Sequence, residues 1–156
     1  MSVTGFSKVM VCLDGSPASE VALPAALRLV AHGGTLILFR VTDLLPPNYL
    51  PEGTDKESLW ASQLGPVEKY LDTVKAGIEG DDLTVATQIG TGATHEVIVD
   101  FATQEAVEAI VMSTHARTGF KQLWLGSVAT DVVKASPIPV MLVHPQCGEG
   151  NSAGNQ

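Results

Sequence analysis

Five short runs of apolar, β-favouring residues constrain the fold of this chain more than any other feature. They cover residues 8–13, 35–41, 83–89, 107–112 and 138–143. The first two are apolar almost throughout, which is typical of strands that are covered on both faces. Segments with helical periodicity separate the runs, so strands and helices alternate along the chain. This alternation predicts an α/β fold: an open, five-stranded parallel sheet with right-handed crossovers and helices on both faces.

The first helical segment has recognisable start and stop signals. Ser16 is a favourable N-cap and Pro17 a favourable first helical residue. The helix is expected to run to about residue 32 and to stop at the glycine pair 33–34. Pro24 removes a helical hydrogen bond, so we expect a kink near Glu20.

The second helical segment follows the least regular part of the chain. Residues 42–58 contain three prolines and a glycine, and a loop of this length is expected to be a lid, an interface arm or a mobile segment. Apolar residues then recur in steps of three and four from Trp60 to Ile78, which predicts one helical face. Gly65-Pro66 lies inside that pattern and predicts a kink or a broken first turn.

Two further helices are expected at residues 93–103 and 127–135. In the last apolar run, Pro139 cannot donate a hydrogen bond to a neighbouring strand, which places this strand at an edge of the sheet.

Composition limits the domain organisation and the partners. The 156 residues fit one domain, expected at residues 1–145, followed by a disordered tail at 146–156. A content of 45% hydrophobic and 17% charged residues is typical of a folded protein. The net charge of −8 argues against nonspecific binding to nucleic acid or to an anionic membrane surface.

Targeting signals are not evident. Residues 1–8 lack the pattern of a secretory signal, and every apolar run is shorter than the ~20 residues that span a bilayer. Cys12 and Cys147 have no metal-binding or disulfide spacing. We therefore expect a cytoplasmic protein without a membrane partner.

Several well-defined chemistries are excluded by the motifs. Gly15 does not begin a P-loop match, and the turn at Gly90 and Gly92 lacks the third glycine of a dinucleotide fingerprint, since His95 stands there. The histidines lack metal-ligand spacing, and His115 has no paired acid or nucleophile. No catalytic residue is predicted.

The remaining candidate site combines Asp14, at the end of the first strand, with the loop from Ser113 to Ser127. Ligands of open α/β sheets bind beyond the carboxyl ends of the strands, where the strand order reverses. Asp14 could accept a hydrogen bond from a ribose or adenine group, or help to hold Mg²⁺ through phosphate oxygens; equally, it could cap the first helix. Ser127 could bind a phosphate together with the N–H groups of Ser127, Val128 and Ala129, or it could be a plain N-cap. In the same loop, Arg117 and Lys121 could neutralise phosphates or simply face solvent.

Three segments carry a resemblance to a known family: residues 9–16 (VMVCLDGS), residues 110–119 (IVMSTHARTG), and residues 125–128 (LGSV) leading to 137–143 (PIPVMLV). Together they resemble the universal stress protein family, over nearly the whole chain. The resemblance implies a Rossmann-like nucleotide-binding architecture with strand order 3-2-1-4-5. It also implies a homodimer formed through the last strand, Val140–Val143.

Some members of that family bind ATP through the motif G-x-x-G-x9-G-[ST]. Here the frame falls on Ser113 to Ala116, then nine residues, then Gly126-Ser127, so the spacing and the final Gly-Ser are kept while both leading glycines are replaced. The resemblance implies that Asp14 contacts the adenosine, that Val41 flanks the adenine and that phosphates bind at residues 126–129. The implied nucleotide-binding set is Leu13, Asp14, Val41, Ser113, Ala116, Gly126, Ser127, Val128 and Ala129, with Arg117 and Lys121 as candidate phosphate contacts and Asp14 as an indirect metal contact through ATP.

Two functions follow from different parts of this pattern. The retained Gly126-Ser127 and Asp14 favour a dimeric stress-response switch that binds ATP, with or without Mg²⁺, and that is at most a slow ATPase. The replaced glycines at Ser113 and Ala116, with the proline-rich stretch 42–58, favour a nucleotide-free dimeric interaction module. If the motif requires positive φ at Ala116, its side chain costs about 1–2 kcal/mol there.

Overall fold

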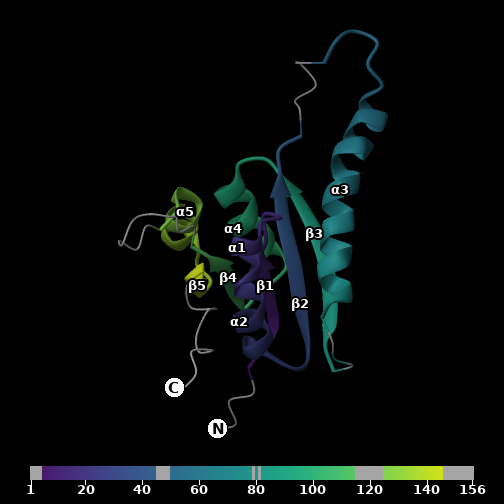
Figure 1. The fold of residues 1–156 in the computed structure, drawn as a ribbon. Coiled ribbons are helices and arrows are strands. Elements are labelled where there is room, and N and C mark those ends of the chain that lie inside the picture. The colour runs from purple at the N-terminus through teal and green to yellow at the C-terminus, as the bar shows by residue number, and fades with distance from the viewer. Residues whose placement is uncertain (1–4, 45–49, 79, 81, 115–124, 146–156) are drawn as a thin grey trace, which may run out of the picture.

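The computed structural model describes residues 5–44, 50–78, 80, 82–114 and 125–145. Its strands form one parallel sheet in the order β3-β2-β1-β4-β5, which confirms the expected topology (Figure 1). The strands are β1 (Phe6–Cys12), β2 (Val30–Thr42), β3 (Thr84–Thr91), β4 (Ala109–Ser113) and β5 (Val140–Val143). The helices are α1 (Pro17–Glu20), α2 (Ala22–Leu29), α3 (Lys56–Ala76), α4 (Thr94–Gln104) and α5 (Ser127–Ala135).

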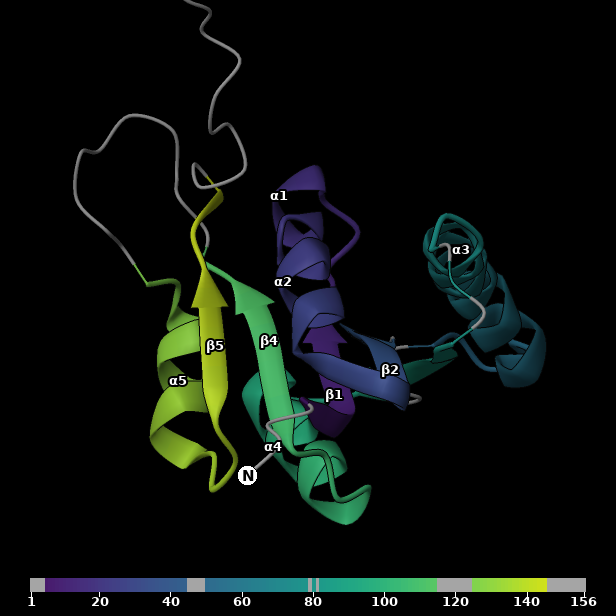
Figure 2. The same cartoon turned by 90° about the horizontal axis from the view of Figure 1, so that it is seen from below.

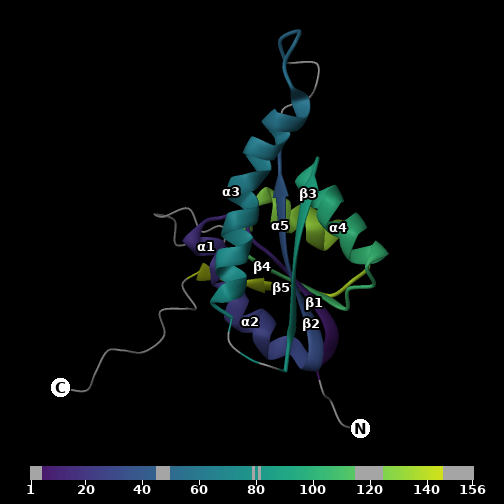
Figure 3. The same cartoon turned by 90° about the vertical axis from the view of Figure 1, so that its right-hand side faces the viewer.

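Helices cover both faces of the sheet. In Figure 2, α1, α2 and α3 lie on one side of the strands, and α4 and α5 lie on the other. In Figure 3, which looks toward the β3 edge, α3 and α4 again lie on opposite sides of the sheet. The central strands are therefore buried on both faces, which explains why their sequences are apolar without alternation.

Two hydrophobic clusters occupy the two faces, and successive residues of a strand contribute to them in turn. On β2, Leu36 and Leu38 pack with α2 and α3, whereas Ile37 and Phe39 pack with α4 and α5. Phe39 also stacks on Phe101 of α4, with ring centroids 4.6 Å apart. This alternation decides toward which face each residue at the carboxyl edge of the sheet projects.

The first helical segment differs from the prediction at its end. It is interrupted at Val21, as Pro24 predicted, but α2 ends at Leu29 and β2 begins at Val30. The expected stop at the glycine pair 33–34 is wrong, because Gly33 (φ +71°) belongs to an irregular start of β2 and donates from its N–H to the carbonyl of Asp82 (2.7 Å).

The helix α3 is longer and more regular than predicted. It begins at Lys56, inside the stretch predicted to be irregular, because the Asp55 side chain caps it by accepting from the Ser58 N–H (3.3 Å). The helix runs through Pro66 without interruption, so the predicted broken first turn at residues 65–66 is wrong. Residues 45–49 of the preceding segment lie outside the described chain.

The strand β5 lies at the sheet edge, as Pro139 predicted. Pro139 itself precedes the strand and accepts from the Ile110 N–H through its carbonyl (2.9 Å). The predicted tail at 146–156 lies outside the described residues. Among the helices that the structure describes, none has the length and apolar character needed to cross a membrane.

Candidate functional site

The strand order reverses between β1 and β4, where the sheet has an indentation at its carboxyl edge. The last pairing of β1 with β2 joins Cys12 to Phe39, and the Leu13 N–H donates to the Phe39 carbonyl (2.8 Å). β2 continues three residues beyond Phe39, paired with β3. Thr114, just after β4, still donates from its N–H to Val143 of β5 (2.9 Å). Asp14 therefore lies at the reversal point, between longer neighbours, where ligands of such sheets bind.

Asp14 holds the turn that leads into α1. Its Oδ1 accepts from the Ser16 N–H (2.8 Å) and from the Ser16 hydroxyl (2.5 Å), while its own N–H donates to Ser19 Oγ (3.2 Å). Ser16 is the N-cap of α1 and accepts from the Ser19 N–H (3.2 Å). The capping interpretation of Asp14 is thus partly confirmed, since the carboxylate orders the residue that caps the helix. The Asp14 side chain remains exposed.

The amino end of α5 presents backbone donors that the helix does not use. Gly126 is the N-cap and has no side chain to accept from them. Helical hydrogen bonding begins with the Thr130 N–H, which donates to the Gly126 carbonyl (3.0 Å). The N–H groups of Ser127, Val128 and Ala129 therefore have no partner inside the helix. The interpretation of Ser127 as the N-cap is wrong, since Ser127 is the first helical residue and its side chain is exposed.

Ser113, the last residue of β4, and Thr114, which follows it, are both buried. Ser113 is 8% exposed and Thr114 is 5% exposed. Ser113 is the last residue of β4 and does not have positive φ. The hydroxyl of Thr114 is buried but has no hydrogen-bond partner among the residues that the structure describes. A buried hydroxyl without a partner costs free energy, so it calls for an explanation at this position. Thr114 was not predicted as a site residue from the sequence; its signal there is a hydroxyl directly after a strand at the reversal point.

The other predicted residues take different places. Leu13 is buried in the cluster beneath α2 and α3, whereas Val41 packs on the α4–α5 side. Ala129 is buried and Val128 packs beside it in the same α4–α5 cluster, so these two residues offer their backbone rather than their side chains. Predicted positions Ala116, Arg117 and Lys121 lie outside the described residues.

A cluster around Arg40 was also missed by the sequence analysis. The Arg40 guanidinium lies over the Tyr70 ring, 5.2 Å from Cζ to the ring centroid. The Tyr70 hydroxyl donates to Glu20 Oε1 (3.0 Å). Burial, together with this hydrogen bond, raises the pKa of Tyr70 to about 12. The cluster joins β2, α1 and α3 next to the turn at Asp14.

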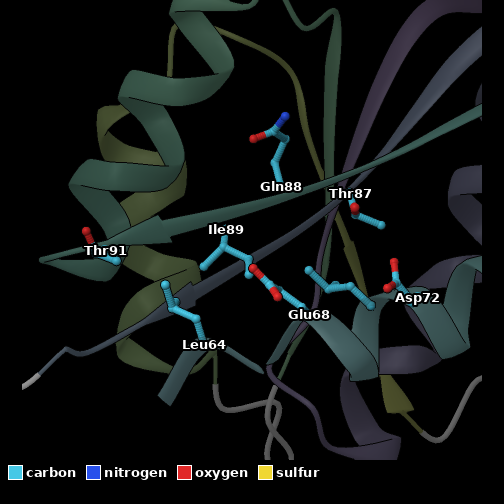
Figure 4. Close-up of a pocket in the computed structure, with 8 residues that line it drawn as sticks. Leu64, Glu68, Asp72, Thr87, Gln88, Ile89 and Thr91 are labelled. Atoms are coloured by element: carbon cyan, nitrogen blue, oxygen red, sulfur yellow. The ribbon is translucent and has the colours of Figure 1, made fainter. Parts of the chain in front are cut away.

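A separate hollow of about 470 Å³ lies between α3 and β3 (Figure 4). Leu64 and Glu68 of α3 face Ile89 of β3 across it. None of the predicted site residues lines this hollow.

Metal and thiol chemistry have little support in the described residues. They contain no group of three or more His, Cys, Asp or Glu side chains arranged to hold a metal ion. Burial raises the pKa of the Cys12 thiol to about 12, so this thiol stays protonated near neutral pH and behaves as a small packing group.

Comparison with known proteins identifies the relatives of this chain. The profile of the universal stress protein family matches residues 5–144. A universal stress protein from Thermus aquaticus is 30% identical over 142 residues, which cover 89% of this chain and 99% of the relative. Universal stress protein MJ0577 of Methanocaldococcus jannaschii is 37% identical over 73 residues, a match that spans only 47% of this chain and 45% of the relative.

Solved structures agree with these matches. The structure of MJ0577 superposes with a TM-score of 0.72 at 27% identity, covering 89% of this chain and 96% of MJ0577. A universal stress protein in complex with cAMP has a TM-score of 0.60 at 22% identity, covering 90% of this chain and 98% of the other. An Arabidopsis thaliana family member with AMP bound has a TM-score of 0.58 at 19% identity, covering 94% and 97%. The last two likenesses establish a shared fold.

Proposed function

Because the chain belongs to the universal stress protein family, we propose that it binds an adenine nucleotide, ATP, at the carboxyl ends of β1 and β4. In this proposal the protein is a dimer that acts as a nucleotide-dependent switch in a stress response. The observation that carries this proposal is the amino end of α5. Three consecutive N–H groups, from Ser127 to Ala129, lack helical partners, and the N-cap Gly126 has no side chain to satisfy them. Such an end favours an anion, through both its free donors and the helix dipole.

The buried Thr114 hydroxyl gives independent support. It lies after β4 at the reversal of the sheet, and no described residue is its hydrogen-bond partner. A bound ligand with acceptor oxygens would supply that partner and would remove the cost of burying the hydroxyl. Relatives of the same fold bind adenine nucleotides, namely cAMP in one structure and AMP in another.

Each part of the site has a chemical role in this proposal. Asp14 orders the turn through Ser16 and offers its exposed carboxylate to the ribose, while the first turn of α5 holds the phosphates. Mg²⁺ would bind phosphate oxygens, with Asp14 as an indirect contact. Asp14 already accepts two hydrogen bonds from Ser16, which suits a positioning role better than that of a general base. We therefore propose binding, with hydrolysis at most slow.

The amino end of α5 permits a sharp test. Proline is tolerated at the first helical position, and Gly126 already has the extended backbone (φ −58°, ψ 156°) that a residue before proline adopts. Ser127→Pro therefore removes one N–H donor without breaking the helix. Ser127→Ala is the matched control, because it removes the hydroxyl and keeps the N–H.

Calorimetric titration with Mg-ATP measures the outcome. A hydrogen bond to a charged group is worth roughly 1.5–3 kcal/mol, so we expect Ser127→Pro to weaken binding by about ten- to a hundred-fold relative to Ser127→Ala. Absence of heat with the unmodified protein at millimolar ATP would refute the proposal, because a Kd of about 1 mM already corresponds to a binding free energy of only roughly 4 kcal/mol.

A second candidate function, a nucleotide-free dimeric module, is favoured by the β5 edge. Met141 on β5 is 40% exposed and Val133 on α5 is 46% exposed, so apolar surface lies beside an unpaired strand edge. A second copy pairing through Val140–Val143 would cover it. Sedimentation of the unmodified protein and of Met141→Lys, with and without ATP, separates the candidates. A dimer that Met141→Lys disrupts and that ignores ATP favours the second function.

A further inference from the structure

Arg40 is held in a fixed position beside the proposed nucleotide site. One side of its guanidinium faces the Tyr70 ring, with Cζ 5.2 Å from the centroid. It also covers the backbone of Gly15: a Cβ placed on Gly15 would lie 2.8 Å from Nη1 and 3.0 Å from Cζ. Gly15 has φ +87°, a conformation that disfavours any side chain. The guanidinium therefore packs directly on the turn that contains Asp14.

Within the described ranges of the chain, no direct partner balances the charge of Arg40. Among the described residues, no carboxylate lies within 4.0 Å of its guanidinium, and the guanidinium donates no hydrogen bond. Glu20, on the other side of Tyr70, accepts from the Tyr70 hydroxyl. Arginine stays charged at every physiological pH, and its donors lie in one plane that matches carboxylate and phosphate oxygens. Arg40 thus offers a half-buried, pre-organised cation with unused donors.

Its position in the sheet relates it to the nucleotide. Because Cys12 pairs with Phe39, Arg40 stands beyond the end of β1, level with the Asp14 turn. The amino end of α5 belongs to the other half of the sheet, since α5 connects β4 to β5. The two positive features therefore lie on opposite sides of Asp14. If α5 holds the 5′ phosphates, Arg40 lies on the side of the adenosine.

We propose that Arg40 is a second anion-binding point, which selects adenine nucleotides that carry a phosphate on the 2′ or 3′ oxygen of the ribose in addition to the 5′ phosphate. This inference rests on the proposed nucleotide-binding function. A ribose phosphate suits the site because a planar guanidinium binds phosphate through two parallel hydrogen bonds. The neutral adenine ring would gain less from a fixed positive charge.

The test compares ligands that differ only in the ribose phosphate. Calorimetry with adenosine 5′-monophosphate, adenosine 3′,5′-bisphosphate and adenosine 2′,5′-bisphosphate is carried out on the unmodified protein, Arg40→Met and Arg40→Lys. Methionine keeps an unbranched chain on Tyr70 and removes the charge, whereas lysine keeps the charge and removes the planar fork. Arg28→Met, in the exposed last turn of α2, is the matched control.

We expect the unmodified protein and Arg28→Met to bind one bisphosphate about ten- to a hundred-fold more tightly than the monophosphate. Arg40→Met should abolish this preference and leave monophosphate binding nearly unchanged, and Arg40→Lys should keep part of it. Equal affinity for the mono- and bisphosphates, or a preference that survives in both Arg40 variants, would overturn the inference while leaving the proposed function intact. If no adenine nucleotide binds, both the Arg40 inference and the proposed nucleotide-binding function fail.

Discussion

Replacing Thr114 with valine should change the stability of the protein in opposite directions with and without nucleotide. Thr114 is 5% exposed, and in the described part of the chain its hydroxyl has no hydrogen-bond partner. A buried hydroxyl without a hydrogen bond costs roughly 1–3 kcal/mol, and valine has nearly the same shape without the polar atom. We therefore expect Thr114→Val to raise the free energy of unfolding of the nucleotide-free protein by about 1 kcal/mol. For a chain of this length, that corresponds to a rise in Tm of about 2–4 °C.

At saturating nucleotide, Thr114→Val should be less stable than the unmodified protein. A ligand stabilises the folded state in proportion to the logarithm of its concentration over Kd, so a weaker ligand stabilises less. If the Thr114 hydroxyl donates to the nucleotide, Thr114→Val loses that hydrogen bond. If the acceptor is a charged phosphate oxygen, the nucleotide-induced gain of this variant should then be smaller than that of the unmodified protein by roughly 1.5–3 kcal/mol, which exceeds the gain of about 1 kcal/mol without nucleotide.

Urea unfolding of dialysed protein, with and without ATP, measures both effects. The control is Thr103→Val, because the exposed Thr103 hydroxyl donates to the Val99 carbonyl (2.7 Å) within α4. That variant should change stability by less than about 1 kcal/mol and should not respond differently to ATP. A loss of stability in nucleotide-free Thr114→Val would show that the hydroxyl is already satisfied, and the reasoning would be wrong.

Two further predictions concern the core. Burial raises the pKa of Cys12 from 9.0 to about 12, and burial with the Glu20 hydrogen bond raises that of Tyr70 from 10.0 to about 12. Because the folded pKa values exceed the unfolded ones, keeping these two groups neutral contributes stability that is fully present below pH 9 and is lost as the pH rises toward 12. Cys12→Ala removes one of the two groups, so its urea midpoint should fall less steeply across that pH range than the midpoint of the unmodified protein. A Cβ on Gly90 would collide with Val97 Cγ1 and would lie 2.9 Å from Phe39 Cζ. Gly90→Ala should therefore cost roughly 1–3 kcal/mol in urea unfolding. Adding Val97→Ala should relieve only part of the strain, because the close contact with Phe39 remains. An unchanged midpoint in the single variant would contradict this.

The fold followed from the sequence wherever local pattern and tertiary packing agree. Strands buried on both faces must be apolar throughout, so their positions were visible in the chain. The strand order was not, because pairing of distant segments leaves no local signal; it came from the resemblance. The glycine pair 33–34 was misinterpreted because glycine serves equally in a helix stop and in an irregular strand, and only the contact of Gly33 with Asp82 decides between them.

The candidate site was predictable only in part, for a related reason. Asp14 and the amino end of α5 follow from motifs that are short and local. The contact of Arg40 with Tyr70 and Gly15 joins three elements, and the missing partner of Thr114 emerges only when every buried polar group is counted in three dimensions. The Arg40 contacts have no sequence signature, and the only local hint of Thr114 is a hydroxyl directly after a strand.

The geometry of Ser113 changes how the altered motif is weighed. A glycine is required where φ is positive or where a Cβ would block a ligand. Ser113 ends a regular β4 strand, and positive φ is not found there, so the first replacement causes no backbone strain. Ser113 follows Met112, which packs toward α4 and α5, so by strand alternation its side chain projects toward the opposite face, where Val111 packs with α2. The α5 side of the site is thus approached by the backbone of Ser113 rather than by its hydroxyl. The replaced first glycine therefore argues little against nucleotide binding, and the sensitivity of the motif to its missing glycines rests on Ala116.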